Sequence, residues 1–166
     1  MTVLSEKYLF KKYTSIAISG HRHLPKDFDI GLVEKKLRLL IEKSFDVFLV
    51  GMAIGFDTMC FQILEKLREE YKNISIIACV PCRDQDALFN KAQKIEYRRM
   101  LDSADEIVYI SEKYTDKCMQ QRNKFMVDNS SALFYYMNVN FGGTANTVKY
   151  ALSKGKPILE LRENEK

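Results

Sequence analysis

The stretch Leu49–Phe61 reads LVGMAIGFDTMCF. An apolar run, Asp46–Gly51, ends at one glycine, a second glycine follows at Gly55, and an amphipathic pattern begins directly afterwards. The run predicts a buried strand, and the pattern predicts a helix. Glycines between a strand and a helix indicate that another group approaches the backbone closely. This stretch therefore predicts a strand–turn–helix unit with a binding turn.

The same alternation of apolar runs and helical periodicity extends through the chain. Runs that predict strands occupy residues 15–19, 46–51, 74–80, 106–110, 132–137 and 157–161, and Pro81 is expected to end the third. Helical patterns include residues 87–101 and 118–127, and the last helix is expected to stop at Gly155. Continuously apolar strands between helices predict an α/β, Rossmann-like three-layer sandwich with a mostly parallel sheet of about six strands.

Composition is that of an ordinary globular protein. The chain has 166 residues, 46% of them hydrophobic and 29% charged, with a net charge of +4. We expect one domain over residues 1–166 with a core from about 15 to 161, and loose ends in the first dozen residues and in RENEK (162–166). No signal peptide or membrane span is evident, so we expect a cytoplasmic protein with no membrane partner. The mild charge argues against a nucleic-acid partner.

The four cysteines give no metal or redox prediction. Cys79 and Cys82 form CVPC, which suits either a redox dithiol or a core thiol followed by a loop thiol. RDQDA follows where a redox motif would lead into a helix, so we favour the second interpretation. Zinc would require two more ligands, and Cys60 and Cys118 each stand alone in a helical pattern.

Unusual residues follow four of the predicted strands. They are GHRHLP (20–25), GMAIGFD (51–57), PCRDQD (81–86) and NVNFGGTANT (138–147). In this fold class, ligands bind beyond the carboxyl ends of the strands, so the four segments should share one rim. The glycine turns match neither the dinucleotide fingerprint nor a P-loop. Free N–H groups at the helix starts nevertheless predict phosphate or ribose binding.

Several charged side chains near this rim are candidates. Arg122 lies inside a predicted helix, where a guanidinium suits a phosphate clamp or simply a helix surface. Asp57 suits helix capping as well as ribose binding. His21 and His23 suit acid–base work or an ordinary polar loop. Cleavage of an N-glycosidic bond requires a carboxylate beside the sugar, and no pair for that chemistry can be assigned.

Five segments resemble one known family. ISGHRHLP, VGMAIGFDTMCFQILE, CVPC, CMQQRNKFMVDNSSALFYYMN and GGTANTVKYA are similar to the YpsA-like branch of the SLOG superfamily. That superfamily includes the LOG phosphoribohydrolases (lysine decarboxylase-like proteins) and the Rossmann-like domain of DprA. The resemblance runs from about Ser15 to Leu161, and its strongest part is RNKFMVDNS followed by GGTANT.

The resemblance implies a fold that binds nucleotides or nucleotide-derived ligands, including ADP-ribose-like signals. In LOG enzymes, an arginine and a glutamate act in phosphoribohydrolysis. Arg122 matches the arginine, but Thr147 stands in place of the glutamate and supplies no negative charge. The turn Gly142–Thr144 fits the family's phosphate-binding loop, although it is shorter and lacks a proline. The resemblance also leaves a homodimer open.

Our leading prediction is a binding protein for a nucleotide or nucleotide-derived small molecule, with no cofactor and no metal, that senses or sequesters a signal. The alternative is an N-glycosidic bond hydrolase or transferase, with Arg122 and Asp57 as its catalytic residues. A third hypothesis, less favoured than these two, is binding of single-stranded nucleic acid by analogy with DprA. The predicted ligand-binding residues are Gly20, His21, Arg22, Gly51, Met52, Ala53, Gly55, Asp57, Pro81, Arg122, Asn123, Gly142, Gly143, Thr144 and Thr147.

Overall fold

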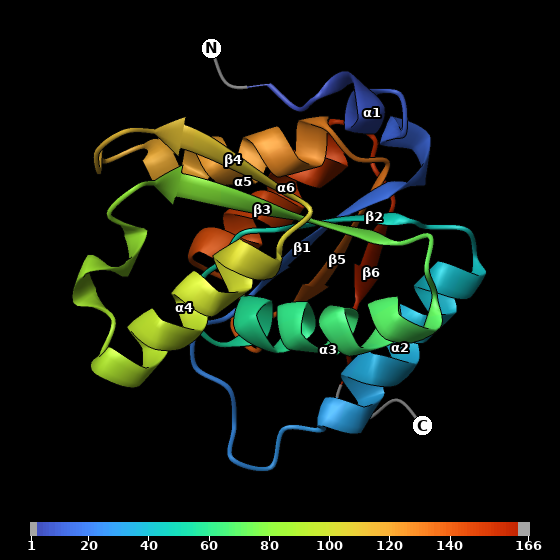
Figure 1. The fold of residues 1–166 in the computed structure, drawn as a ribbon, viewed down its shortest axis with the longest axis horizontal. Coiled ribbons are helices and arrows are strands. Elements are labelled where there is room, and N and C mark those ends of the chain that lie inside the picture. The colour runs from blue at the N-terminus through green and yellow to red at the C-terminus, as the bar shows by residue number, and fades with distance from the viewer. Residues whose placement is uncertain (1–2, 163–166) are drawn as a thin grey trace.

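A six-stranded parallel sheet forms the centre of the molecule (Figure 1). It is seen in a computed structural model, which describes residues 3–162. The strands are β1 (Ser15–Gly20), β2 (Val47–Val50), β3 (Ser75–Cys82), β4 (Glu106–Ser111), β5 (Ala132–Tyr136) and β6 (Ile158–Glu160). The helices are α1 (Glu6–Leu9), α2 (Ile30–Glu42), α3 (Phe56–Glu70), α4 (Lys91–Ser103), α5 (Cys118–Asp128) and α6 (Gly143–Ser153), with 3₁₀ turns η1 (Lys12–Thr14) and η2 (Gln85–Leu88).

The strand order is β4-β3-β2-β1-β5-β6, and every pairing is parallel. The chain builds the sheet outward from β1 to β4 and then returns to the other side of β1 with β5 and β6. The direction of building therefore reverses between β1 and β5, which is where α/β sheets of this kind leave a crevice. The predicted Rossmann-like α/β class is confirmed.

Helices cover both faces of the sheet (Figure 1). Alternate strand residues face opposite sides, so each face has its own apolar core. One core joins strand residues such as Ile16 and Phe48 to α2, α3 and α4. The other joins residues such as Ala17 and Leu49 to α1, α5 and α6. Because both faces are covered, the strands are apolar without alternation, which is the pattern seen in the sequence.

The beginning of the chain is more ordered than the sequence suggested. Residues expected to be loose include α1 and η1, and Leu4 and Tyr8 are buried in the core on the α5 side. Burial of these two side chains fixes the segment against the sheet. The prediction for RENEK falls mostly on residues 163–166, outside the described residues.

Two other boundaries differ from the prediction. Strand β3 continues through Pro81 to Cys82, which pairs with Ser111 and is 1% exposed, so Cys82 is not a loop thiol. Strand β2 ends opposite Ala78, so β3 has only one neighbouring strand at Pro81, where a proline is tolerated. The predicted helix over 87–101 is a 3₁₀ turn followed by α4, because Asn90 forms a capping box with Gln93.

Candidate functional site

The four rim segments do meet at one edge of the sheet. They follow β1, β2, β3 and β5, which are neighbours in the parallel sheet, so their carboxyl ends point the same way. Two cavities lie one on each side of the first turn of α5. A further cavity of about 430 Å³ lies between α3 and α4, and Ile54 and Gly55 of the turn after β2 line it.

The turn from β2 into α3 is tightly tied to β1. Gly55 has a φ of 86°, and a Cβ there would lie 2.3 Å from the carbonyl oxygen of Arg22. The amide of Phe56 donates to the carbonyl of His21 at 3.1 Å. Met52 also has a positive φ, 65°, which is uncommon for a residue with a side chain. What approaches Gly55 is therefore the backbone after β1.

Asp57 occupies the first turn of α3 and is 4% exposed. Its Oδ2 accepts a hydrogen bond from the amide of Ala53 at 3.2 Å. Its Oδ1 is buried and has no hydrogen-bond partner among the described residues. Burial raises the pKa of Asp57 from 3.8 to about 6, against the opposing effect of the positive charge of Arg122. A buried carboxylate oxygen without a donor is a costly feature of the kind that occurs at functional sites.

Arg122 lies on α5 beneath the same turn and is 5% exposed. Its Nη1 donates to the carbonyl oxygens of Gly51 and, at 3.5 Å, Cys79, and its Nε donates to Oδ1 of Asn123 at 2.8 Å. Burial lowers the pKa of this guanidinium, an effect that the negative charge of Asp57 opposes. Arg122 therefore holds the ends of β2 and β3 in place.

The glycines of the rim differ in what surrounds them. A Cβ on Gly51 would lie 2.9 Å from both Arg122 Nη1 and Asp57 Oδ2, so protein side chains fill that space. A Cβ on Gly20 would collide with the ring of Phe56. Nothing lies within 4 Å of the equivalent positions on Gly142 and Gly143. Only the second glycine turn leaves open space for a ligand.

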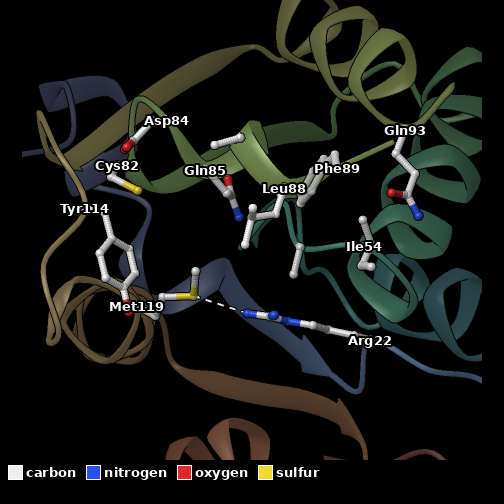
Figure 2. Close-up of a pocket in the computed structure, with 12 residues that line it drawn as sticks. Arg22, Ile54, Cys82, Asp84, Gln85, Leu88, Phe89, Gln93, Tyr114 and Met119 are labelled. Atoms are coloured by element: carbon white, nitrogen blue, oxygen red, sulfur yellow. Dashed lines mark hydrogen bonds between the residues drawn. The ribbon is translucent and has the colours of Figure 1, made fainter. Parts of the chain in front are cut away.

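The first cavity has a volume of about 330 Å³ and opens between η2 and the first turn of α5 (Figure 2). At its lower edge in Figure 2, Arg22 Nη2 donates to Met119 Sδ at 3.3 Å. A thioether is a weak acceptor, so the protein contact of this exposed guanidinium is weak and its remaining donors face solvent. The lining residues are Arg22, Ala53, Ile54, Cys82, Asp84, Gln85, Ala87, Leu88, Phe89, Gln93, Tyr114 and Met119.

The second cavity, of about 210 Å³, lies between α5 and α6. It is more polar than the first and includes the start of α6. The hydroxyl of Thr147 donates to the carbonyl of Gly143 at 2.9 Å. The lining residues are Asp116, Met119, Gln120, Asn123, Lys124, Gly143, Asn146, Thr147 and Tyr150.

Some predicted residues line the first or the second cavity, and others lie elsewhere on the rim. Arg22 and Ala53 line the first cavity, and Asn123, Gly143 and Thr147 line the second. The remaining predicted residues line neither of these two cavities: Gly20, His21, Gly51, Met52, Gly55, Asp57, Pro81, Arg122, Gly142 and Thr144.

The segment 81–86 was expected on the rim, but of this segment and the residues that follow it only Pro81 was predicted to bind a ligand, whereas Gln85, Leu88 and Phe89 line the first cavity. Gln85 is buried, donates to the carbonyl of Gly51 at 3.2 Å and accepts from Tyr97 at 3.0 Å. Leu88 is 99% exposed and Phe89 packs against Tyr97. These two apolar residues closely follow the rim segment 81–86, but the predicted helix over 87–101 included them and hid their place at the cavity wall.

Thiol, metal and membrane features add little to the site. Burial raises the pKa of Cys82 to about 12, so the thiol at the cavity wall is a poor nucleophile. Within residues 3–162, no three His, Cys, Asp or Glu side chains gather as metal ligands. No helix in that range has both the length and the apolar character needed to cross a bilayer.

Comparison with known proteins gives the same fold and family as the resemblance. The model described as "YspA SLOG family" (YpsA) matches residues 28–158. The uncharacterised SPbeta prophage-derived protein YoqJ of Bacillus subtilis is 28% identical over 138 residues, which is 76% of this chain and 79% of that protein.

Two solved structures of DNA processing protein A have the same fold at 20% identity. The Streptococcus pneumoniae protein gives a TM-score of 0.67 over 93% of this chain, which spans about half (51%) of that protein. The Helicobacter pylori protein gives 0.69 over 99% of this chain and 73% of that protein.

One expectation about partners is wrong. We expected the mild net charge to argue against nucleic acid. The H. pylori protein, which has this fold, is described by its single-stranded DNA binding mode. Net charge is a property of the whole chain and does not report the charge at one edge of a sheet.

Proposed function

This chain belongs to the YspA SLOG family, and we propose that it binds a nucleotide or a nucleotide-derived small molecule at the carboxyl edge of its sheet. In this proposal it senses or sequesters the ligand. The observation that carries the proposal is the cavity of about 330 Å³, because its volume lies within the roughly 300–1,000 Å³ of small-molecule sites. Apolar side chains line most of it, and a few polar groups converge on it, which suits a nucleobase with a charged substituent.

We assign the contact with the ligand's phosphate to Arg22. Arg22 is exposed at the cavity edge, and within residues 3–162 its Nη2 donates to the sulfur of Met119. A phosphate oxygen is a far stronger acceptor and would replace that contact at little cost. Arg122, by contrast, is buried and bonded to main-chain carbonyls, so its role is to position the Gly51 turn.

Asp57 supports the proposal through its unsatisfied oxygen. Asp57 lines neither the first nor the second cavity, so a ligand hydroxyl would have to displace the turn at Ala53 to give Oδ1 the donor that the described residues do not supply. Ribose carries two adjacent hydroxyls. Binding of such a group would favour the ionised carboxylate and lower the pKa of Asp57.

Calorimetry with AMP and ADP-ribose tests this function. Wild-type protein should bind at least one of them, and Arg22→Ala should weaken binding by about tenfold or more, since hydrogen bonds to charged groups contribute about 1.5–3 kcal/mol. Arg83→Ala is the matched control, because Arg83 is an exposed rim arginine paired with Glu112 and lines neither cavity. Absence of binding by wild-type protein at millimolar ligand would refute the proposal.

A second candidate, hydrolysis of the ligand's N-glycosidic bond, is favoured by the pKa of Asp57. A carboxyl group with a pKa of about 6 is suited to proton transfer near neutral pH. Chromatographic detection of free base from AMP, abolished in Asp57→Asn, would support this activity. Bound but unchanged nucleotide after prolonged incubation would reject it and leave the binding function standing.

A further inference from the structure

The first and the second cavity are adjacent. Met119, in the first turn of α5, lines both of them. The smaller, at about 210 Å³, falls below the usual range of small-molecule sites of roughly 300–1,000 Å³. It is therefore better suited to one part of a ligand than to a complete one.

The chemistry of the first cavity suits a planar ring. Tyr114, Leu88 and Phe89 offer aromatic and aliphatic surface on opposite walls (Figure 2). Polar groups stand at the same cavity: the carboxylate of Asp84 is an acceptor, and the amide of Gln93 can donate. The Oε1 of Gln93 already accepts from the amide of Asn90 at 2.9 Å.

The second cavity offers mainly hydrogen-bonding groups. Asn123, Asn146 and Gln120 carry amide and Lys124 carries ammonium donors at its walls. The amides at the start of α6 lie beside Gly143, where no heavy atom occupies the space of a Cβ. These groups suit a sugar and a second polar ring.

Positive charge lies where the cavities adjoin. Arg22 donates to Met119 Sδ at 3.3 Å, and Met119 lines both cavities. Burial is the main cause of the pKa shifts of Asp57 and Arg122, and the positive charge of Arg22 acts to lower both pKa values. We infer that the site takes a two-lobed ligand, in which two nucleoside units occupy the two cavities and the phosphate that links them replaces Met119 Sδ as the acceptor of Arg22. This inference rests on the proposed nucleotide-binding function and specifies its ligand class.

Adenylyl-(3′→5′)-adenosine and the mononucleotides 3′-AMP and 5′-AMP, each of which contains one of its adenosines and a phosphate, test the inference by calorimetry. The dinucleotide should bind at one-to-one stoichiometry and about tenfold or more tightly than either half, because linked groups bind with a high effective concentration. Equal affinities for the dinucleotide and its tighter half would overturn the inference. So would two mononucleotides bound per chain with no gain on linking.

Three variants locate the lobes. Asn146 is an exposed residue that lines the second cavity, so Asn146→Phe would place an aromatic ring in that cavity. Ala87→Phe would place an aromatic ring in the first cavity in the same way. Asn146→Phe should remove the dinucleotide's advantage while one mononucleotide keeps its affinity within about twofold, and Ala87→Phe should weaken both. Ser153→Phe, exposed on the same helix as Asn146 and outside both cavities, should change neither. Unchanged dinucleotide binding in Asn146→Phe would refute the two-lobed site.

Failure of the inference can be told from failure of the proposed function. Binding of a mononucleotide without a gain for the dinucleotide rejects only the inference, whereas no binding of these three probes or of ADP-ribose rejects both. A single-stranded adenine oligonucleotide distinguishes the source of the two units. A strand as natural source predicts an affinity above that of the dinucleotide and a steeper salt dependence. A free dinucleotide-like ligand predicts equal affinities.

Discussion

Substitution of Asp57 by asparagine should change how stability depends on pH. The pKa of Asp57 rises from 3.8 in the unfolded chain to about 6 in the fold, mainly through burial. The folded state therefore holds this proton more tightly, so its stabilising effect is complete below about pH 4 and is lost as pH rises through 6. A shift of about two pKa units corresponds to about 3 kcal/mol, at 1.36 kcal/mol for each unit.

Urea unfolding at several pH values between about 4 and 7 measures this effect. Asparagine keeps the shape of the side chain but carries no charge, so the free energy of unfolding of Asp57→Asn minus that of wild type should rise by about 2.5 kcal/mol over that range. Asp102→Asn makes the same chemical change at an exposed position of α4 and controls for general pH effects. A difference that stays constant with pH, or that moves the other way, would show that Asp57 is not a destabilised buried acid.

Four further substitutions test the contacts at the two glycine turns of the rim, each by urea unfolding. Arg122→Gln should destabilise the protein by about 3 kcal/mol, because main-chain carbonyls and a buried carboxylate lose their positive partner; a cost below about 1 kcal/mol would contradict this. Gly55→Ala should cost about 3 kcal/mol or more, whereas Gly142→Ala, also at positive φ but in open space, should cost only about 1 kcal/mol. Equal costs would mean that the backbone after β1 does not confine Gly55. Met52→Gly removes the side chain of a residue that has a positive φ, so it should destabilise the protein less than an ordinary buried Met→Gly change does. An equal destabilisation would show that the backbone at Met52 is not strained.

The sequence predicted the architecture well because the apolar pattern and the layered fold have the same cause. A strand covered on both faces must be apolar throughout, as in Val47–Val50, and this signal is independent of distant contacts. The ends of helices and strands were less predictable, because a capping interaction or a long-range contact determined them. The capping box of Asn90 set the start of α4, and long-range packing of Leu4 and Tyr8 ordered the first segment.

The site was only partly predictable, since a glycine does not say which group approaches it. Gly51 and Gly55 are close to other parts of the protein, whereas Gly142 and Gly143 face open space. These cases have the same sequence signature and differ only in tertiary contacts. Likewise, Arg122 was expected to pair with a phosphate at the rim, whereas its burial under Gly51 depends on how α5 packs on β3.

One carbonyl oxygen joins the two helical layers. The oxygen of Gly51 accepts from Arg122 on α5, over one face of the sheet, and from Gln85, which bonds to Tyr97 of α4 over the other. A molecule in the first cavity that displaces Gln85 would weaken the contacts that hold α5, whose residues form a wall of the second cavity. Binding in the first cavity should therefore alter the affinity of the second. Thermodynamic reciprocity makes the effect equal in both directions.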